Sequence, residues 1–259
     1  MKKNTLFLVS ALFLVFYTSC DKKTKEDSDI FIKPELLDSI FTKKYDATLP
    51  CPDCDGIETS IKFFKDSTMV RTIYYDGKSK FPETYYGKWK LKDSVFIASF
   101  DNEKLFYKIK NAQTIMRVGS DLKDIKGDLK SQYTFKSSDI LTDDLFLGTY
   151  VLGDTISTHN RIQIFKTKQD IYTLNFIGTE VKDSLKSYCQ FQLNGKINDL
   201  DRLSVNLNKL NDTINGRLSF IFIKNNMHAF YEDITVDKVP KFCKEIPTFS
   251  VEGTYKKTN

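Results

Sequence analysis

The sequence predicts an all-β protein built from two small antiparallel domains, and three observations lead to this prediction. The chain holds 21 phenylalanines and 13 tyrosines, and together with its many Val, Ile and Thr residues they suit the half-buried surfaces of β-sheets. Short segments rich in these residues are separated by turns about every eight to twelve positions, which is typical of a barrel or a sandwich. A polar linker at residues 138–144 divides the segments into two blocks.

The first domain is expected to span residues 45–137. Its turns are marked by polar or glycine-containing steps such as Asp76-Gly77 and Asp101-Asn102, which favour tight reversals of the chain. Strands joined by tight turns run antiparallel, and closing such a meander into a barrel removes the exposed edges that promote aggregation. The candidate strands are Ile57–Phe64, Thr68–Tyr75, Tyr85–Leu91, Ser94–Phe100, Lys104–Ile109, Thr114–Val118 and Ser131–Phe135.

The second domain is expected at residues 145–259. Gly148-Thr-Tyr and Gly253-Thr-Tyr resemble each other near its start and its end, and we interpret them as equivalent positions of a second barrel. The candidate strands are Gly148–Leu152, Arg161–Phe165, Ile171–Phe176, Ser187–Leu193, Leu203–Leu207, Gly216–Ile223 and Met227–Tyr231.

Residues 1–19 are predicted to be a lipoprotein signal peptide. A basic start precedes an apolar run at residues 6–16, and this run is much shorter than the roughly 20 residues that a membrane-spanning helix needs. It ends at Tyr17-Thr-Ser-Cys20, which resembles the bacterial lipobox, with Tyr17 in place of the usual leucine. The resemblance implies cleavage before Cys20 and acylation of that cysteine, which anchors the chain to a membrane. The alternative is an ordinary signal peptide with a chance cysteine at its end.

Residues 20–44 are predicted to form a lipidated tether. The segment directly after Cys20 is mostly charged, so it cannot bury a core. Farther along, Leu36, Leu37 and Ile40 fall on one helical face together with Phe41, which indicates a short helix or an ordered piece of linker.

Composition argues against several classes of function. The formal net charge is +5, and because the charges are interspersed without a basic stripe, no nucleic-acid partner is expected. The two histidines, His159 and His228, stand far apart, which disfavours a histidine-rich metal site and histidine-based catalysis. The chain also lacks a nucleophile-elbow motif and a phosphate-binding loop. We therefore predict that the protein is not an enzyme.

Four cysteines remain if the lipid occupies Cys20: Cys51, Cys54, Cys189 and Cys243. An even number of cysteines in an exported chain favours disulfides. A bond between Cys189 and Cys243 would close a loop of about fifty residues and stabilise the fold by roughly 4 kcal/mol in the chain-entropy description. The alternative for this pair is two unpaired thiols.

Cys51 and Cys54 are separated by two residues, a spacing with three chemical interpretations. The pair can form a small disulfide loop, exchange disulfides or bind a soft metal. A thioredoxin-type enzyme would place the first cysteine at a helix N-terminus, whereas this motif precedes predicted β-strands. Zinc would need two further ligands, while copper(I) accepts two thiolates with help from a thioether such as Met69 or Met116. We expect a resting disulfide, with the reduced pair as a candidate copper(I) site.

The segment from Tyr45 to Ile57 reads Tyr-Asp-Ala-Thr-Leu-Pro-Cys-Pro-Asp-Cys-Asp-Gly-Ile and resembles the N-terminal domain of the NlpE family. That family carries a Leu-Pro-Cys-x-x-Cys-x-Gly-Ile core that enters a β-barrel, and Tyr86-Gly-Lys-Trp89 is similar to its Gly-x-Trp strand. The resemblance covers roughly residues 45–136. It implies an outer-membrane lipoprotein with a small lipocalin-like first barrel, connected with copper tolerance and with an envelope-stress signalling protein. It also implies a C-terminal disulfide that reports failed oxidative folding.

The leading prediction is a non-enzymatic lipoprotein of the bacterial envelope that senses or buffers copper and redox stress through Cys51 and Cys54. We expect it on the outer membrane, at the periplasmic or the surface face. Two alternatives remain at this stage. The first is a carrier that holds an apolar ligand inside a small barrel, which an aromatic-lined cavity would favour. The second is an adhesion or interaction module at the cell surface.

Overall fold

The computed structural model describes residues 32–258 apart from 139–142, 154–157, 183–184, 211, 224 and 247–248. The predicted signal peptide and Cys20 therefore lie outside the described residues. Within the described part of the chain, no helix has the length and the apolar character that crossing a bilayer requires.

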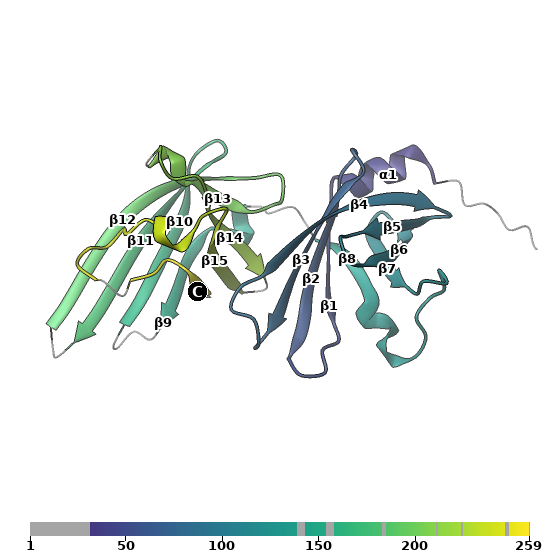
Figure 1. The fold of residues 1–259 in the computed structure, drawn as a ribbon, viewed down its shortest axis with the longest axis horizontal. Helices are drawn as coiled ribbons and strands as arrows, with labels where there is room; N and C mark the ends of the chain where they lie inside the picture. Colours follow the sequence, from purple (N-terminus) through teal and green to yellow (C-terminus); the bar gives the residue numbers. More distant parts are fainter. Residues whose placement is uncertain are drawn as a thin grey trace, which may run out of the picture. The chain divides into compact units, whose positions relative to one another are not determined.

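The first sheet is a closed antiparallel barrel in which each strand pairs with the next and β8 pairs with β1 (Figure 1). A short helix, α1 (Pro34–Phe41), precedes it, and a 3-10 helix, η1 (Asp128–Tyr133), precedes its last strand. Its strands are β1 (Lys44–Leu49), β2 (Gly56–Phe63), β3 (Thr68–Asp76), β4 (Glu83–Lys92), β5 (Val95–Ser99), β6 (Lys104–Asn111), β7 (Thr114–Val118) and β8 (Thr134–Ser138).

The second sheet is also a closed antiparallel barrel, with its first strand β9 paired to its last strand β16. Short helical turns accompany it: α2 (Asp143–Phe146), η2 (Leu207–Lys209) and η3 (Val236–Lys238). Its strands are β9 (Gly148–Gly153), β10 (Thr158–Lys168), β11 (Ile171–Lys182), β12 (Leu185–Ile197), β13 (Leu203–Asn206), β14 (Arg217–Ile223), β15 (Asn226–Glu232) and β16 (Gly253–Thr258).

The all-β prediction with two antiparallel barrels is confirmed, while three strand positions differ from the sequence pattern. The last strand of the first barrel begins at Thr134, because residues 128–133 form a 3-10 helix where a strand was expected from Ser131. The strand at Lys44–Leu49 was not among the predicted strands, and neither was the closing strand at Gly253–Thr258.

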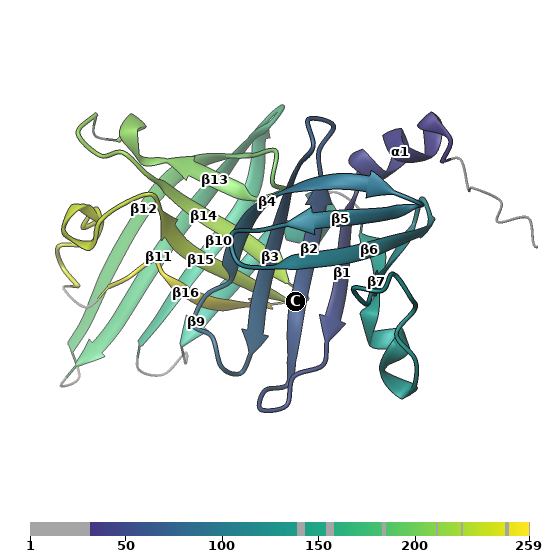
Figure 2. The same ribbon diagram turned by 45° about the vertical axis from the view of Figure 1, so that its right-hand side comes forward.

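Helix α1 closes one end of the first barrel, and the hairpin between β1 and β2 lies at the other end (Figures 1 and 2). Pro34 stands in the first turn of α1, where its missing N–H costs no hydrogen bond. Ile40 is completely buried in the barrel core, and Phe41 stacks on Trp89 with ring centroids 5.4 Å apart. The helix therefore supplies apolar side chains that fill this end of the interior.

The two Gly-Thr-Tyr segments occupy related places in the second barrel. Each begins a strand, and β9 and β16 are paired with each other. The buried Tyr150 donates its hydroxyl to the carbonyl of Phe146 at 3.0 Å, and the buried Tyr255 donates to the carbonyl of Val251 at 2.8 Å. Each tyrosine thus bonds to the carbonyl four residues before it, which fixes the chain as it enters the strand.

Truncation of Ile40, the buried residue of α1, is expected to lower the free energy of unfolding substantially. Ile40→Ala removes apolar surface from a packed core and leaves a cavity, so we expect the free energy of unfolding to fall by about 2–4 kcal/mol. Urea unfolding followed by the fluorescence of Trp89 measures this change. The matched control is the exposed Glu35→Ala on the same helix, for which we expect a change within about 0.5 kcal/mol. Equal effects of the two substitutions would contradict the assigned packing.

His228 predicts an acid sensitivity of the fold. The side chain is completely buried, its Nδ1 lies 3.0 Å from Thr254 Oγ1, and its ring centroid is 4.3 Å from that of Tyr74. Burial lowers the pKa of His228 to about 4, against the opposing effect of Asp76. Because the unfolded chain titrates near 6.5, it binds more protons than the folded chain between these values. The contribution of His228 to stability is therefore complete above pH 6.5 and is lost as the pH falls toward 4.

We expect this loss to amount to roughly 3 kcal/mol between the two pKa values. The measurement is the free energy of unfolding against pH for the native chain and for His228→Gln. The native chain should show the steeper decline below neutral pH, because glutamine does not titrate. Parallel curves for the two proteins would show that His228 does not couple folding to protonation.

Candidate redox and metal site

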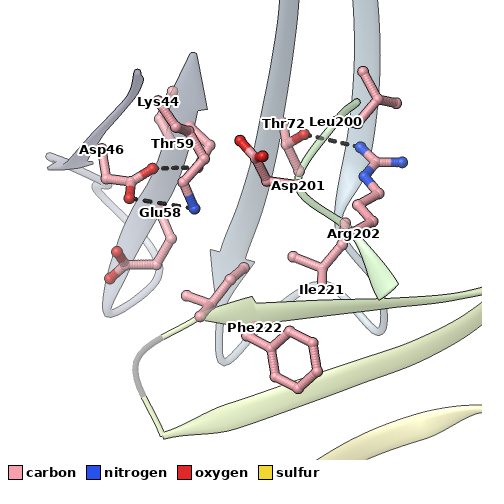
Figure 3. Close-up of a pocket in the computed structure, with 12 residues that line it drawn as sticks. Lys44, Asp46, Glu58, Thr59, Thr72, Leu200, Asp201, Arg202, Ile221 and Phe222 are labelled. Carbon is pink, nitrogen blue, oxygen red and sulfur yellow. Dashed lines mark hydrogen bonds and ion pairs between the residues drawn. The ribbon is translucent and has the colours of Figure 1, made fainter. Parts of the chain in front are cut away.

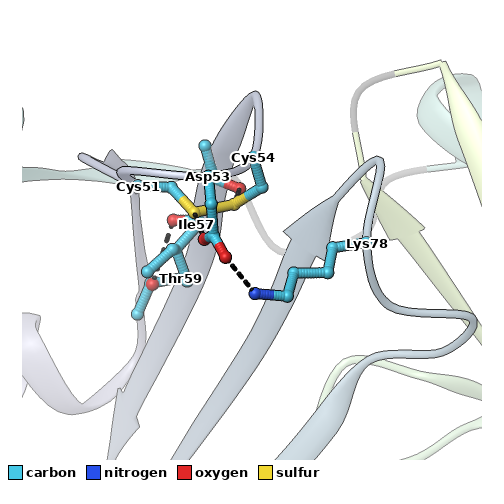
Figure 4. The surroundings of a disulfide bond; sticks show 7 residues. Cys51, Asp53, Cys54, Ile57, Thr59 and Lys78 are labelled. Atoms are coloured by element: carbon cyan, nitrogen blue, oxygen red, sulfur yellow. Dashed lines mark hydrogen bonds and ion pairs between the residues drawn. A yellow bond between two sulfur atoms is a disulfide. The ribbon is translucent and has the colours of Figure 1, made fainter.

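The Cys51–Cys54 pair lies in the hairpin loop between β1 and β2 (Figure 4). The two cysteines form a disulfide with their Cα atoms 5.4 Å apart. Pairing of Leu49 with Ile57 closes the hairpin directly below the loop. Gly56 permits this close approach, because a Cβ at that position would lie 2.6 Å from Thr48 Cγ2. The loop is thus held by strand pairing on both sides, and neither cysteine stands at a helix N-terminus.

Polar contacts connect the loop to the neighbouring hairpin. The backbone N–H of Asp55 donates to the carbonyl of Asp76 at 3.2 Å. Asp53 forms an ion pair with Lys78, and this hydrogen-bonded ammonium group lowers the pKa of the Asp53 carboxyl. The carboxylate therefore stays charged at neutral pH beside the sulfur atoms.

The sulfur atoms are accessible and have oxygen atoms nearby. Both cysteines are partly exposed. Asp53 Oδ1 lies 3.5 Å from Cys51 Sγ, and the carbonyl oxygen of Gly56 lies 3.4 Å from Cys54 Sγ. When the disulfide is reduced, these oxygens can accept hydrogen bonds from the thiols. The negative charge of Asp53 also disfavours a neighbouring thiolate unless a cation binds there.

The donor set at this loop suits a soft cation better than zinc. Cys51, Asp53 and Cys54 offer ligand atoms within 4.8 Å of one another. Zinc in a structural site takes four ligands, whereas two thiolates suffice for copper(I). The thioethers named from the sequence are elsewhere: Met69 is buried in the barrel core, and Met116 packs in a separate cluster with Val95 and Val118. Any metal at the loop would therefore be held by the two thiolates and Asp53.

The Cys189–Cys243 disulfide has a different environment. Its Cα atoms are 5.8 Å apart, and both cysteines are buried against Ile246, Phe191 and Phe249. Phe249 covers Gly178, where a Cβ would lie 2.6 Å from the ring. The bond joins β12 to the segment before β16, so its position suits a crosslink that holds this segment on the second barrel.

A polar cluster connects the two barrels, and the sequence pattern gave no indication of it (Figure 3). Arg202 is 2% exposed and donates to the hydroxyls of Thr72 at 3.1 Å and Thr84 at 2.5 Å, two residues of the first barrel. It also forms an ion pair of 2.5 Å with Glu232 of its own barrel. Burial lowers the pKa of Arg202, and the neighbouring Glu232 opposes this effect.

The cavity of about 200 Å³ beside Arg202 is lined by residues from both barrels. Nearby, Lys62 of β2 forms an ion pair of 3.0 Å with Asp201. Positive and negative groups are thus matched across this junction, which suits packing between the barrels better than ligand recognition. A buried arginine with its partners on other strands leaves no periodic signal in a sequence, so its role is visible only in the fold.

Comparison with known proteins finds a family match in the first barrel. Residues 45–128 match the family described as NlpE N-terminal domain. Lipoprotein NlpE of Escherichia coli K12 is 27% identical over 115 residues, which cover 42% of this chain and 48% of that protein. The chain thus spans about half the length of this curated relative. The resemblance to the NlpE family predicted from the sequence is confirmed.

Two solved structures match parts of this chain. A chain from Shewanella oneidensis shares 21% identity with a TM-score of 0.34, covering 38% of this chain and 88% of its own length. The Cpx pathway activator NlpE from Escherichia coli shares 16% identity with a TM-score of 0.31, covering 60% of this chain and 94% of its own length.

The two disulfides predict unequal effects on stability. Cys189→Ala/Cys243→Ala should lower the free energy of unfolding by about 4 kcal/mol, because it opens a long loop in the unfolded chain. Cys51→Ala/Cys54→Ala opens a very short loop at the surface and should cost about 2 kcal/mol. Urea unfolding followed by circular dichroism compares the two variants. A larger loss for the Cys51–Cys54 variant would contradict these assignments.

Proposed function

Taking residues 45–128 as an NlpE N-terminal domain, we propose that this protein is a non-enzymatic envelope lipoprotein that senses redox or copper stress through Cys51 and Cys54. The observation that supports this proposal most is the accessible disulfide at the end of a fixed hairpin, with Asp53 beside its sulfur atoms. A sensor needs a group that meets the surrounding solution and a scaffold that keeps its geometry in both states.

The chemistry of the proposed sensor has two steps. A reducing dithiol of the envelope gives two electrons and two protons to the disulfide, which becomes the thiols of Cys51 and Cys54 while the dithiol is oxidised to a disulfide. Copper(I) then replaces both thiol protons and forms two copper–sulfur bonds. The pairing of Leu49 with Ile57 closes the hairpin through the backbone, so we expect it to keep the two sulfur atoms close after reduction.

The proposed location follows from the N-terminal segment and from the relatives. Cys20 would carry the lipid, and the outer membrane is the proposed site of anchoring, as the resemblance to the family implies. A curated relative is named as a lipoprotein, and a solved relative is described as an activator of the Cpx pathway. We propose that this chain likewise acts on an envelope-stress signalling protein.

Copper(I) titration tests the proposed sensor directly. The reduced native protein should bind about one copper(I) ion per chain through two thiolates, measured under anaerobic conditions by competition with a chromogenic copper(I) chelator. Cys51→Ser/Cys54→Ser should abolish this binding, while Met69→Leu should leave it unchanged because Met69 lies in the core. The oxidised native protein should bind no copper(I).

The reduced Cys189→Ala/Cys243→Ala variant provides the matched control, since it keeps the proposed site and lacks the other cysteine pair. It should bind copper(I) as the native chain does. Retention of binding by the Cys51→Ser/Cys54→Ser variant would refute a role of the hairpin loop. The sensing proposal fails if two results are obtained together. The reduced native protein binds no copper(I), and cells that carry the native protein respond to copper in the same way as cells that carry Cys51→Ser/Cys54→Ser.

A further inference from the structure

A second cavity lies inside the first barrel, at the end that carries the disulfide hairpin. Its volume is about 310 Å³, which lies within the range of small-molecule sites. Leu49 and Ile57, the residues that flank the hairpin loop, both line it. Figure 4 shows Ile57 and Thr59, two of the lining residues, close to the disulfide. The interior at the opposite end is filled by aromatic side chains and α1, so the two ends of this barrel differ.

Arg71 places a buried positive charge in the wall of this cavity. The residue is 9% exposed, and its guanidinium carbon lies 4.9 Å from the ring centroid of Tyr85 and 4.7 Å from that of Phe100. One terminal nitrogen forms an ion pair with Glu103. Its Nε atom is buried and has no hydrogen-bond partner among the described residues. A buried donor without an acceptor is costly, and an acceptor on a ligand would remove that cost.

Arg117 adds a second positive charge to the same cavity. It pairs across the strands with Tyr107, so both side chains lie on the interior face of the barrel. Within the part of the chain that the structure describes, Arg117 forms no ion pair, and its guanidinium carbon lies 6.0 Å from the ring centroid of Tyr133. Two guanidinium groups thus face the cavity against one carboxylate, that of Glu103.

Tyrosine side chains complete the polar wall. Tyr75, Tyr85 and Tyr107 all line the cavity. Burial raises the pKa of Tyr107 to about 12, so its hydroxyl stays protonated at neutral pH and can donate a hydrogen bond. Tyrosine rings also offer flat apolar surface to a ligand, and they lose little conformational entropy when they are covered.

We propose that this cavity binds a small organic monoanion, with its acidic group facing Arg71 and Arg117 and its flat apolar part against the tyrosine rings. The excess of one positive charge matches a single negative charge on the ligand. A purely apolar ligand, as the sequence-based carrier alternative assumed, would desolvate the guanidinium groups without pairing them. The inference does not depend on copper binding, because none of the cavity residues named here is a cysteine.

Two dyes with the same aromatic skeleton test the proposed charge preference. 8-Anilinonaphthalene-1-sulfonate carries one negative charge, and N-phenyl-1-naphthylamine lacks the sulfonate. Trp89 is the only tryptophan of the chain and lies in the interior of the first barrel. Energy transfer from Trp89 to the bound dye therefore reports binding at this barrel. The oxidised native protein should bind the anionic dye at least about tenfold more tightly than the neutral dye, since a charge-assisted hydrogen bond contributes that much.

Arg117→Gln should remove this preference by lowering the affinity for the anionic dye about tenfold, with little change for the neutral dye. Arg117→Lys should retain the preference because it keeps the charge. Arg161→Gln in the second barrel is the matched control and should bind both dyes as the native chain does. Circular dichroism and the midpoint of thermal unfolding establish that each variant is folded. Equal affinity of the native protein for the two dyes, or an undiminished preference in Arg117→Gln, would overturn the proposal.

Discussion

Closure of the first sheet through the pairing of β1 with β8 is the constraint on which the arrangement of the candidate sites depends. Lys44 pairs with Lys62 on one side and with Ser138 on the other, so β1 is held by two neighbours. A closed sheet has no free edge and turns alternate side chains inward. Access from solvent to the barrel interior is then confined to the two ends. One end is filled by α1, and the other presents the hairpin with Cys51 and Cys54.

The same closure separates the two disulfides by environment. Cys51 and Cys54 sit in a loop that projects beyond the paired strands and is partly exposed. Cys189 lies in β12 of the second barrel and is bonded to Cys243. Aromatic side chains pack against this pair, and both cysteines are buried. Thiol–disulfide exchange requires an attacking thiolate to reach a sulfur atom. A bond at a solvent-exposed loop and a bond under a packed segment therefore suit different roles, a switch and a crosslink.

Local sequence signals were sufficient for the fold class and for the position of the cysteine loop. Turn steps such as Asp76-Gly77 lie where the chain reverses, since the backbone conformations that they favour are set by a few adjacent residues. Long-range contacts were not predictable in this way. The strand from Lys44 pairs with residues at least ninety positions away, and the 3-10 helix at Asp128–Tyr133 moves the start of the last strand of the first barrel to Thr134. Arg71 and Arg117 line the same cavity because of the strand register around the barrel. This register cannot be predicted from a local sequence pattern.

We expect the Cys51–Cys54 bond to act as a reducible switch and the Cys189–Cys243 bond as a buried crosslink. Stepwise reduction of the native protein, followed by differential alkylation and mass spectrometry of each cysteine, measures this directly. We expect Cys51 and Cys54 to become labelled while the protein is still folded, and Cys189 and Cys243 to become labelled only as it unfolds. Reduction of the Cys189–Cys243 bond first in the folded protein would contradict the account.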